Sequence, residues 1–318
     1  MNIFIILLII LAVLTALTFA AGYYMFRFSI LRIEPKPPVF KNPNDPWAII
    51  EPVLAKGREY IESKPFEEWK IKSDDGLKLW ARFMPAYKEN GEVSKKVVLM
   101  MHGYHSFNNN DFAVSSRYVH EAGYSILLPN QRAHNKSEGK YICFGIKERY
   151  DCLKWIQKII SELGDDCEII LMGVSMGCAT VTMTLGLDLP PQVKGCVSDC
   201  GYTSPREQFA HNLKHDYHLP TFPLLYTQKF YCKHIAGFDI DGCNTVDVLK
   251  KNRLPVLFIH GGSDSFVPTD FSRRNYEACA GKKELLIIDE APHAQSFPLA
   301  PEKCWEHLSK FLHDNFSE

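Results

Sequence analysis

Short apolar runs recur along most of the chain, separated by stretches in which apolar residues are spaced three or four apart. The short runs lack polar–apolar alternation, which favours parallel strands covered on both faces. They predict strands at 96–101, 124–129, 168–172, 193–198, 255–260 and 284–288. The stretches between predict helices at 112–121, 146–163, 176–187, 270–279 and 301–316. This rhythm predicts an α/β fold, a mostly parallel sheet with helices on both faces.

Upstream of these strands, the segments 66–72 and 77–84 do alternate polar and apolar residues. The turn-forming sequence Ser73-Asp74-Asp75-Gly76 lies between them, so the pair predicts a β-hairpin. A further helix is expected at 45–63.

The segment 201–253 separates two predicted strands and is too long for an ordinary loop. It carries a cluster of large apolar side chains, namely Phe222, Leu224, Leu225, Tyr226, Phe230 and Tyr231. Insertions of this kind often form lids or binding elements. We expect a helical lid whose Phe222 and Tyr226 line a substrate pocket; the alternative is that these side chains only pack the lid onto the sheet.

The N-terminal apolar run differs from the others, because residues 3–26 contain no charge. A helix of this length crosses the apolar core of a bilayer, and Tyr23 and Tyr24 are placed for its interface. The pattern predicts a single-pass transmembrane anchor at 1–28.

A cleaved signal peptide is the alternative, with a weak small-x-small site at Thr18-Phe19-Ala20. Signal peptides begin with a positive segment, whereas only Met1 and Asn2 precede this run, so a retained anchor is favoured. A proline-rich linker is expected at 29–46 and one folded domain at 47–318.

Charge and cysteine content limit the possible partners and the cellular compartment. The formal net charge is -1 and no basic run occurs, which argues against nucleic acid as a partner. The basic residues nearest the anchor all follow it, namely Arg27, Arg32, Lys36 and Lys41, which predicts a domain on the cytoplasmic side of the cell membrane. The ten cysteines show neither a CxxC pair nor zinc-site spacing, which favours a reducing compartment and no structural metal.

One motif carries candidate chemistry. Gly173-Val174-Ser175-Met176-Gly177 matches G-x-S-x-G, directly after a predicted strand and directly before a predicted helix. That placement is the one a nucleophile elbow requires, with Ser175 at the apex. The alternative is an ordinary turn with an N-cap serine.

A serine hydroxyl needs a base to take its proton. His293 follows the last predicted strand and Asp264 follows the strand before it, so both belong at the carboxyl edge of the sheet with Ser175. We predict a Ser175–His293–Asp264 triad, in the chain order Ser, Asp, His of this architecture. Asp199, which ends another strand, stays open as the alternative acid.

Acyl transfer also needs donors for the developing oxyanion. The backbone N–H groups of Met176 and Tyr104 are the candidates, the latter in the loop His102-Gly103-Tyr104-His105-Ser106. His102 is expected to hold this loop.

From about Val97 onward the chain resembles the α/β-hydrolase superfamily. The resemblance is to its bacterial, often membrane-anchored branch, similar to prolyl-oligopeptidase and dienelactone-hydrolase catalytic domains. It rests on the motifs above, on Asp199-Cys200-Gly201-Tyr202-Thr203-Ser204, and on Gln131-Arg132-Ala133-His134-Asn135-Lys136-Ser137-Glu138-Gly139. Ala133 and Asn135 stand where the family commonly has glycine. The resemblance implies an eight-stranded sheet and a serine hydrolase.

The expected function is hydrolysis of a carboxylic ester, a small-molecule or lipid-like substrate, through an acyl-enzyme. A serine peptidase is the alternative, and a non-catalytic binding protein is a more distant one. No P-loop or dinucleotide motif occurs, so no cofactor is expected. His211, His215 and His218 are expected to be surface histidines rather than a metal site, because the glutamate of H-E-x-x-H is absent.

Overall fold

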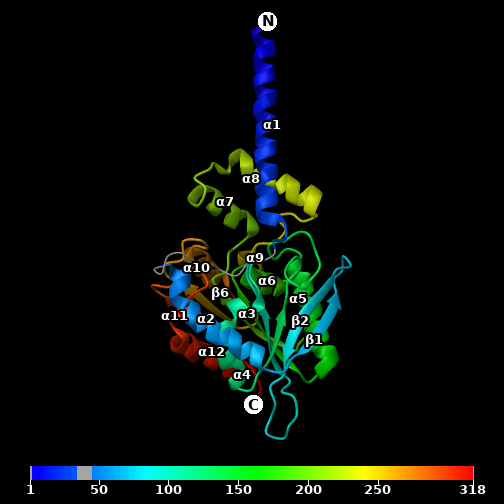
Figure 1. Ribbon diagram of the computed structural model, residues 1–318, viewed down its shortest axis with the longest axis vertical. Coiled ribbons are helices and arrows are strands. Elements are labelled where there is room, and N and C mark those ends of the chain that lie inside the picture. Colours follow the sequence, from blue (N-terminus) through cyan, green and yellow to red (C-terminus); the bar gives the residue numbers. More distant parts are fainter. Residues whose placement is uncertain (1, 34–44, 318) are drawn as a thin grey trace.

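The computed structural model describes residues 2–33 and 45–317. Its centre is an eight-stranded sheet in the order β1-β2-β4-β3-β5-β6-β7-β8 (Figure 1). The strands are β1 (Glu67–Lys72), β2 (Lys78–Met84), β3 (Lys96–Met101), β4 (Ser125–Pro129), β5 (Glu168–Val174), β6 (Val193–Asp199), β7 (Val256–Gly261) and β8 (Lys283–Ile288). The hairpin β1–β2 and the β2–β4 pair are antiparallel, and the remaining pairs are parallel. The predicted α/β architecture is confirmed.

Helices cover both faces of this sheet. The first face packs against α2 (Pro46–Ser63), α4 (Ala113–Glu121), α11 (Ser296–Leu299) and α12 (Pro301–Asn315). The second packs against α5 (Glu148–Leu163), α6 (Met176–Thr184), α9 (Thr245–Leu249) and α10 (Thr269–Ala278). Along β3, Val98 and Met100 enter the first core, whereas Val97, Leu99 and Met101 enter the second. Because both sets are buried, the strand is apolar without alternation.

The N-terminal helix α1 (Ile3–Ile30) is one unbroken helix, and its outer part stands away from the body (Figure 1). Within the described residues it is the one helix long and apolar enough to cross a membrane, with a mean hydropathy of 3.1. Its last turns are different, because Phe26 and Ile30 are buried in the domain, at 1% and 0% exposure. Leu31 then forms an isolated antiparallel bridge with Tyr141.

The foot of α1 therefore belongs to the folded domain. The predicted linker at 29–46 is wrong at its start, because residues 29 and 30 are helical and packed. Its central part, 34–44, lies outside the described residues.

The segment 201–253 forms α7 (Pro205–His215), α8 (Thr221–Tyr231), a π-helical turn η1 (Cys232–Ala236) and α9. Helices α7 and α8 lie around the foot of α1 (Figure 1). Contact between α1 and α8 is close, since a Cβ at Gly22 would come within 2.0 Å of the Thr227 hydroxyl oxygen. The segment thus packs against the N-terminal helix as well as the sheet.

All ten cysteines are free thiols, and all except Cys243 are buried. Cys167 and Cys196 pack among apolar neighbours, as small hydrophobic side chains do. Cys178 is also buried, but its Sγ lies 2.8 Å from the Ser198 hydroxyl oxygen.

Candidate active site

Ser175 lies at a sharp turn between β5 and α6. Its backbone has φ 56° and ψ −117°, a conformation that residues with a side chain seldom adopt. The two glycines of the motif allow this turn. A Cβ at Gly173 would lie 2.2 Å from the carbonyl oxygen of Gly177, and a Cβ at Gly177 would lie 1.8 Å from that of Met101. Backbone packing therefore requires glycine at both positions.

His293 and Asp264 reach Ser175 from the loops that follow β8 and β7. His293 Nε2 lies 2.9 Å from Ser175 Oγ, and His293 Nδ1 lies 2.7 Å from Asp264 Oδ2. The Ser175 and Asp264 side chains are buried, whereas the His293 ring is partly exposed. The structure thus brings the three predicted residues into one hydrogen-bonded chain.

Asp264 accepts hydrogen bonds at both carboxylate oxygens. The N–H groups of Phe266 and Val267 donate to Oδ1 at 3.0 and 2.8 Å, and His260 Nε2 lies 3.2 Å from Oδ2. Burial raises the pKa of Asp264, but the hydrogen bonds from His260 and His293 lower it by a larger amount. The pKa is therefore below its usual value. The carboxyl group is therefore ionised at neutral pH.

His260 contacts this site, and the sequence analysis did not assign it a role. Its Nε2 lies 2.9 Å from the carbonyl oxygen of Val267, and its Nδ1 lies 2.6 Å from the Ser272 hydroxyl. These contacts fix the ring beside Asp264. The available signal was its position at the end of β7, four residues before Asp264.

Asp199, the alternative acid, is buried at the end of β6. Its backbone carbonyl accepts the Ser175 N–H at 2.9 Å, while its side-chain Oδ1 has no hydrogen-bond partner among the described residues. Burial raises the pKa of this carboxyl group to about 7. The carboxylate that accepts the hydrogen bond of His293 is that of Asp264 instead.

Asp199 should make stability depend on pH. A raised carboxyl pKa means that the folded state binds the proton more tightly than the unfolded chain does. The stabilisation is therefore present below about pH 4 and is lost as the pH rises through about 7. Asp199→Asn mimics the neutral acid, so we expect wild type to lose unfolding free energy relative to this variant between pH 4.5 and 8. Each unit of pKa shift corresponds to about 1.4 kcal/mol. Urea unfolding at both pH values measures the difference; parallel pH profiles would contradict the expectation.

The two predicted oxyanion donors belong to backbone segments near Ser175. The N–H of Met176 is in the first turn of α6, where amides have no partner within the helix. Tyr104 follows Gly103 in the loop after β3, and a Cβ at Gly103 would contact that of Ser175 at 3.3 Å. The Gly103 N–H donates to Asp111 Oδ2 at 2.6 Å. Both candidate amides thus belong to backbone close to the serine.

The His102 side chain connects this loop to the loop after β4. The Gln131 N–H donates to His102 Nε2 at 3.0 Å, so the proton is on Nδ1, which donates to the Gly103 carbonyl oxygen at 2.8 Å. Burial lowers the pKa of His102, which keeps the ring neutral. Thr180 of α6 donates to Gln131 Oε1 at 3.2 Å. Both ring nitrogens are thereby engaged, as a structural role requires.

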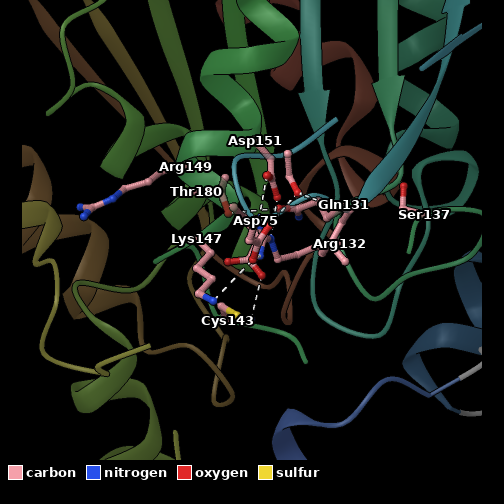
Figure 2. A network of polar contacts seen from close by, with 12 residues as sticks. Asp75, Gln131, Arg132, Ser137, Cys143, Lys147, Arg149, Asp151 and Thr180 are labelled. Atoms are coloured by element: carbon pink, nitrogen blue, oxygen red, sulfur yellow. Dashed lines mark hydrogen bonds and ion pairs between the residues drawn. The ribbon is translucent and has the colours of Figure 1, made fainter. Parts of the chain in front are cut away.

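A buried arginine secures the loop that carries Gln131 (Figure 2). Arg132 Nε lies 2.6 Å from Asp151 Oδ2 on α5, and its Nη1 lies 2.8 Å from Asp75 Oδ2 in the β1–β2 turn. Lys147 reaches the same Asp75 oxygen at 3.5 Å. These ion pairs connect the hairpin, α5 and the loop after β4.

At two positions of the same loop, where the sequence resemblance leads us to expect glycine, the backbone is left-handed. Ala133 and Asn135 have φ 60° and 45°, in the left-handed region. Glycine adopts this region without strain, whereas alanine adopts it at a cost.

Two cavities meet at Ser175. The first encloses about 720 Å³ of empty space, part of it open to solvent, and is mainly apolar. Its walls include Phe144, Phe209, Leu213 and Val267, together with Met25 and Phe28 of α1. The second, of about 980 Å³, lies on the His293 side and carries the polar side chains Glu51, His105, Ser106, Asn110 and Asp111. Tyr104 lines both.

Phe222 and Tyr226 do not line either cavity at Ser175, so the structure does not place them where the sequence analysis expected. They are exposed on α8, at 73% and 57%. Their rings contact each other with centroids 5.7 Å apart. Gln228 and Leu213 of the same insertion do reach the apolar cavity.

Two groups of side chains have the composition of metal ligands. Cys200, Asp264 and His293 place one ligand atom each within 4.8 Å of one another, but burial raises the pKa of the Cys200 thiol, which keeps it protonated. His211 and His215 stack with ring centroids 4.4 Å apart, and His211 Nε2 lies 2.9 Å from the Ser265 carbonyl oxygen. We assign a metal to neither group.

Comparison with known proteins agrees with this architecture. Residues 96–231 match the family described as alpha/beta hydrolase fold. The chain is 29% identical over 207 residues to YqkD, an uncharacterized protein of Bacillus subtilis (strain 168). That match covers 64% of this chain and 68% of YqkD.

Solved structures give the same result. Esterase Pf2001 of Pyrococcus furiosus is similar with a TM-score of 0.63 at 22% identity, over 90% of this chain and 98% of the esterase. The acylaminoacyl peptidase of Pyrococcus horikoshii is similar with a TM-score of 0.57 at 18% identity, over 80% of this chain and 43% of the peptidase. At these identities the likeness is one of fold. The chain has the α/β-hydrolase fold, as the sequence predicts.

Proposed function

We propose that this α/β-hydrolase-fold chain is a serine hydrolase that cleaves carboxylic esters. The observation that carries the proposal is the hydrogen-bonded chain from Ser175 Oγ through His293 to Asp264, with separations of 2.9 and 2.7 Å. It lies at the carboxyl edge of the sheet, and two cavities open onto Ser175. The fold similarity to esterase Pf2001 supports the reaction class.

In the proposed reaction, His293 Nε2 takes the Ser175 proton as Oγ bonds to the ester carbonyl carbon. Asp264 stabilises the imidazolium that forms, and the N–H groups of Met176 and Tyr104 stabilise the oxyanion. The carbonyl–alkoxy bond then breaks, and His293 returns the proton to the leaving alcohol. Water cleaves the acyl-enzyme by the same steps, which releases the acid and restores Ser175.

An activated serine reacts with phosphorus electrophiles, so a fluorophosphonate probe should label this chain at Ser175. Labelling should be lost in Ser175→Ala and should fall at least a hundredfold in rate in His293→Ala, because the hydroxyl then lacks its base. Mass spectrometry of the labelled peptide identifies the site. Thr182→Ala, in the same helix but outside the site, serves as the control. Equal labelling of wild type and Ser175→Ala would reject Ser175 as nucleophile.

A serine peptidase is the second candidate, favoured by the fold similarity to the acylaminoacyl peptidase. The same triad cleaves amides when the leaving amine is protonated by the histidine. Parallel assays with p-nitrophenyl esters and with aminoacyl and prolyl anilides distinguish the two. A kcat/KM higher for anilides than for matched esters would assign the peptidase.

We further propose that α1 is a retained membrane anchor with the domain on the cytoplasmic side. Its apolar segment supports the anchor, and the basic residues after it support the orientation. Free thiols at all ten cysteines fit a reducing compartment. Full-length protein should stay in the membrane after a carbonate wash. A mature chain that starts at Ala21 would show cleavage instead.

A further inference from the structure

We infer that the substrate is an amphiphilic ester resident in the bilayer. Its acyl chain would occupy the apolar cavity against α1, and its polar alcohol would occupy the cavity beside His293. The inference rests on the proposed function and identifies its substrate class and the route by which the substrate reaches Ser175.

The membrane helix forms one wall of the substrate cavity. Met25, Phe28 and Ser29 of α1 line the same apolar cavity as Ser175. Ser29 is fixed there by two contacts, since its carbonyl oxygen accepts the Tyr104 hydroxyl at 3.0 Å and its Oγ accepts Gln228 Nε2 at 2.9 Å. Because Tyr104 belongs to the candidate oxyanion loop, α1 connects directly to the site.

This wall begins where the bilayer core should end. From Ile3 to Tyr23 a helix rises about 30 Å, at 1.5 Å per residue, which is the thickness of the hydrocarbon region. Met25 follows two residues later in the same unbroken helix. The apolar cavity is therefore placed at the membrane interface, within reach of a lipid acyl chain.

Exposed aromatic side chains lie on α8, which packs against α1. Tyr226 and Phe230 are one helical turn apart on α8, and Phe230 is 45% exposed. Phe222 lies at a non-helical kink near the start of α8, and its ring contacts that of Tyr226. The Phe230 ring lies 5.7 Å from that of Phe19, inside the apolar segment of α1, and the Tyr231 hydroxyl donates to the Phe19 carbonyl oxygen. The aromatic surface of α8 (Phe222, Tyr226 and Phe230) is thus continuous with the spanning helix. Tyrosine is enriched at the bilayer interface, and exposed phenylalanine side chains insert into the boundary between headgroups and acyl chains. We therefore assign the membrane surface as the partner of this aromatic surface.

The two cavities differ in the way that an amphiphile requires. In the proposed reaction His293 protonates the leaving alcohol, so the alcohol lies on the His293 side. That cavity presents Glu51, Asn110 and Asp111, which suit hydroxyl groups of a polar alcohol. The acyl group then points into the cavity walled by Met25 and Phe28.

The first test changes the part of the apolar cavity wall that α1 forms. In full-length protein in phosphatidylcholine vesicles, Met25→Trp should lower the ratio of kcat/KM for p-nitrophenyl decanoate to that for the acetate at least tenfold. Met25→Ala should shift the preferred acyl chain to a longer one. Leu14→Trp is the matched control, three helical turns earlier in the span, and should leave the ratio unchanged.

The second test changes the exposed aromatic surface of α8. The double variant Phe222→Ser/Tyr226→Ser should lower the rate on vesicle-borne dioleoylglycerol, relative to the rate on soluble p-nitrophenyl butyrate, at least fivefold. Tyr87→Ser is the matched control, because Tyr87 is 60% exposed in the loop between β2 and β3, away from α1. This control should leave the relative rate unchanged.

The outcomes separate the inference from the proposed function. If the wild-type protein neither reacts with the fluorophosphonate probe nor hydrolyses any ester, the proposed function itself is rejected. If the variants still react with the probe and hydrolyse the acetate ester, but the ratio measured in either test is unchanged, the inference is overturned and the proposed function stands. If Met25→Trp fails to label, Met25→Ala decides the first test, and an unchanged chain-length preference there overturns the inference.

Discussion

Asp264→Asn should lower kcat on the order of 10⁴-fold. An asparagine side chain in place of Asp264 carries no charge to stabilise the imidazolium. Its amide N–H would also donate to His293 Nδ1, which forces the ring proton onto Nε2. That tautomer cannot accept the proton of Ser175. Steady-state hydrolysis of a p-nitrophenyl ester measures kcat, and an unchanged unfolding midpoint would show that the fold is intact.

Asp199→Asn is the matched control for this prediction, since it makes the same change at the other buried aspartate of the site. Asp199 makes no hydrogen bond to His293, so we expect its kcat to fall less than tenfold at neutral pH. The opposite ranking of the two variants would make Asp199 the acid of the triad.

A chain that starts at Lys41 should be several kcal/mol less stable than one that keeps the foot of α1. Phe26 and Ile30 are almost wholly buried, and each contributes about 1.5–3 kcal/mol. The loss is a large fraction of the 5–15 kcal/mol typical of a domain. It would also uncover Tyr141 and the apolar cavity, which favours aggregation.

The control for this truncation is a chain that starts at Gly22, which lacks most of the apolar span but keeps the buried turns. Urea unfolding of the two shortened proteins measures the difference directly. Equal midpoints would show that the foot of α1 contributes nothing to the domain.

The sequence predicted the sheet closely, because its strands are short apolar runs buried on both faces. The segment 96–101 corresponds to β3 without error, and 284–288 misses β8 by one residue. The approach of Ser175, Asp264 and His293 followed from the same pattern. Each residue lies in the turn or loop after a parallel strand, and parallel strands end at one edge. Their chemical roles stay predictions until variants are assayed.

Features that depend on distant partners were not predictable in this way. The burial of Ile30 requires Ile142, whose N–H donates to the Ile30 carbonyl oxygen and which lies far away in sequence. In α8 apolar residues occur on all sides, so the pattern did not reveal that Leu225 faces inward while Phe222 and Tyr226 face outward. The contact of His260 with Asp264 depends on a loop conformation that no periodicity encodes.

Because most of the thiols are buried, the number of alkylated cysteines measures how much of the folded chain has opened to solvent. Nine of the ten thiols are buried and only Cys243 is partly accessible, so a slow alkylating reagent can modify one site in the folded chain and ten in the unfolded chain. Cys232 directly follows α8 and is buried in the same cluster as Phe26 and Ile30. Cys152 of α5 and Cys196 of β6 are instead buried in the core between the sheet and the helices of its second face. The order in which these thiols react, read by mass spectrometry, therefore separates a local movement of the helices around α1 from global unfolding.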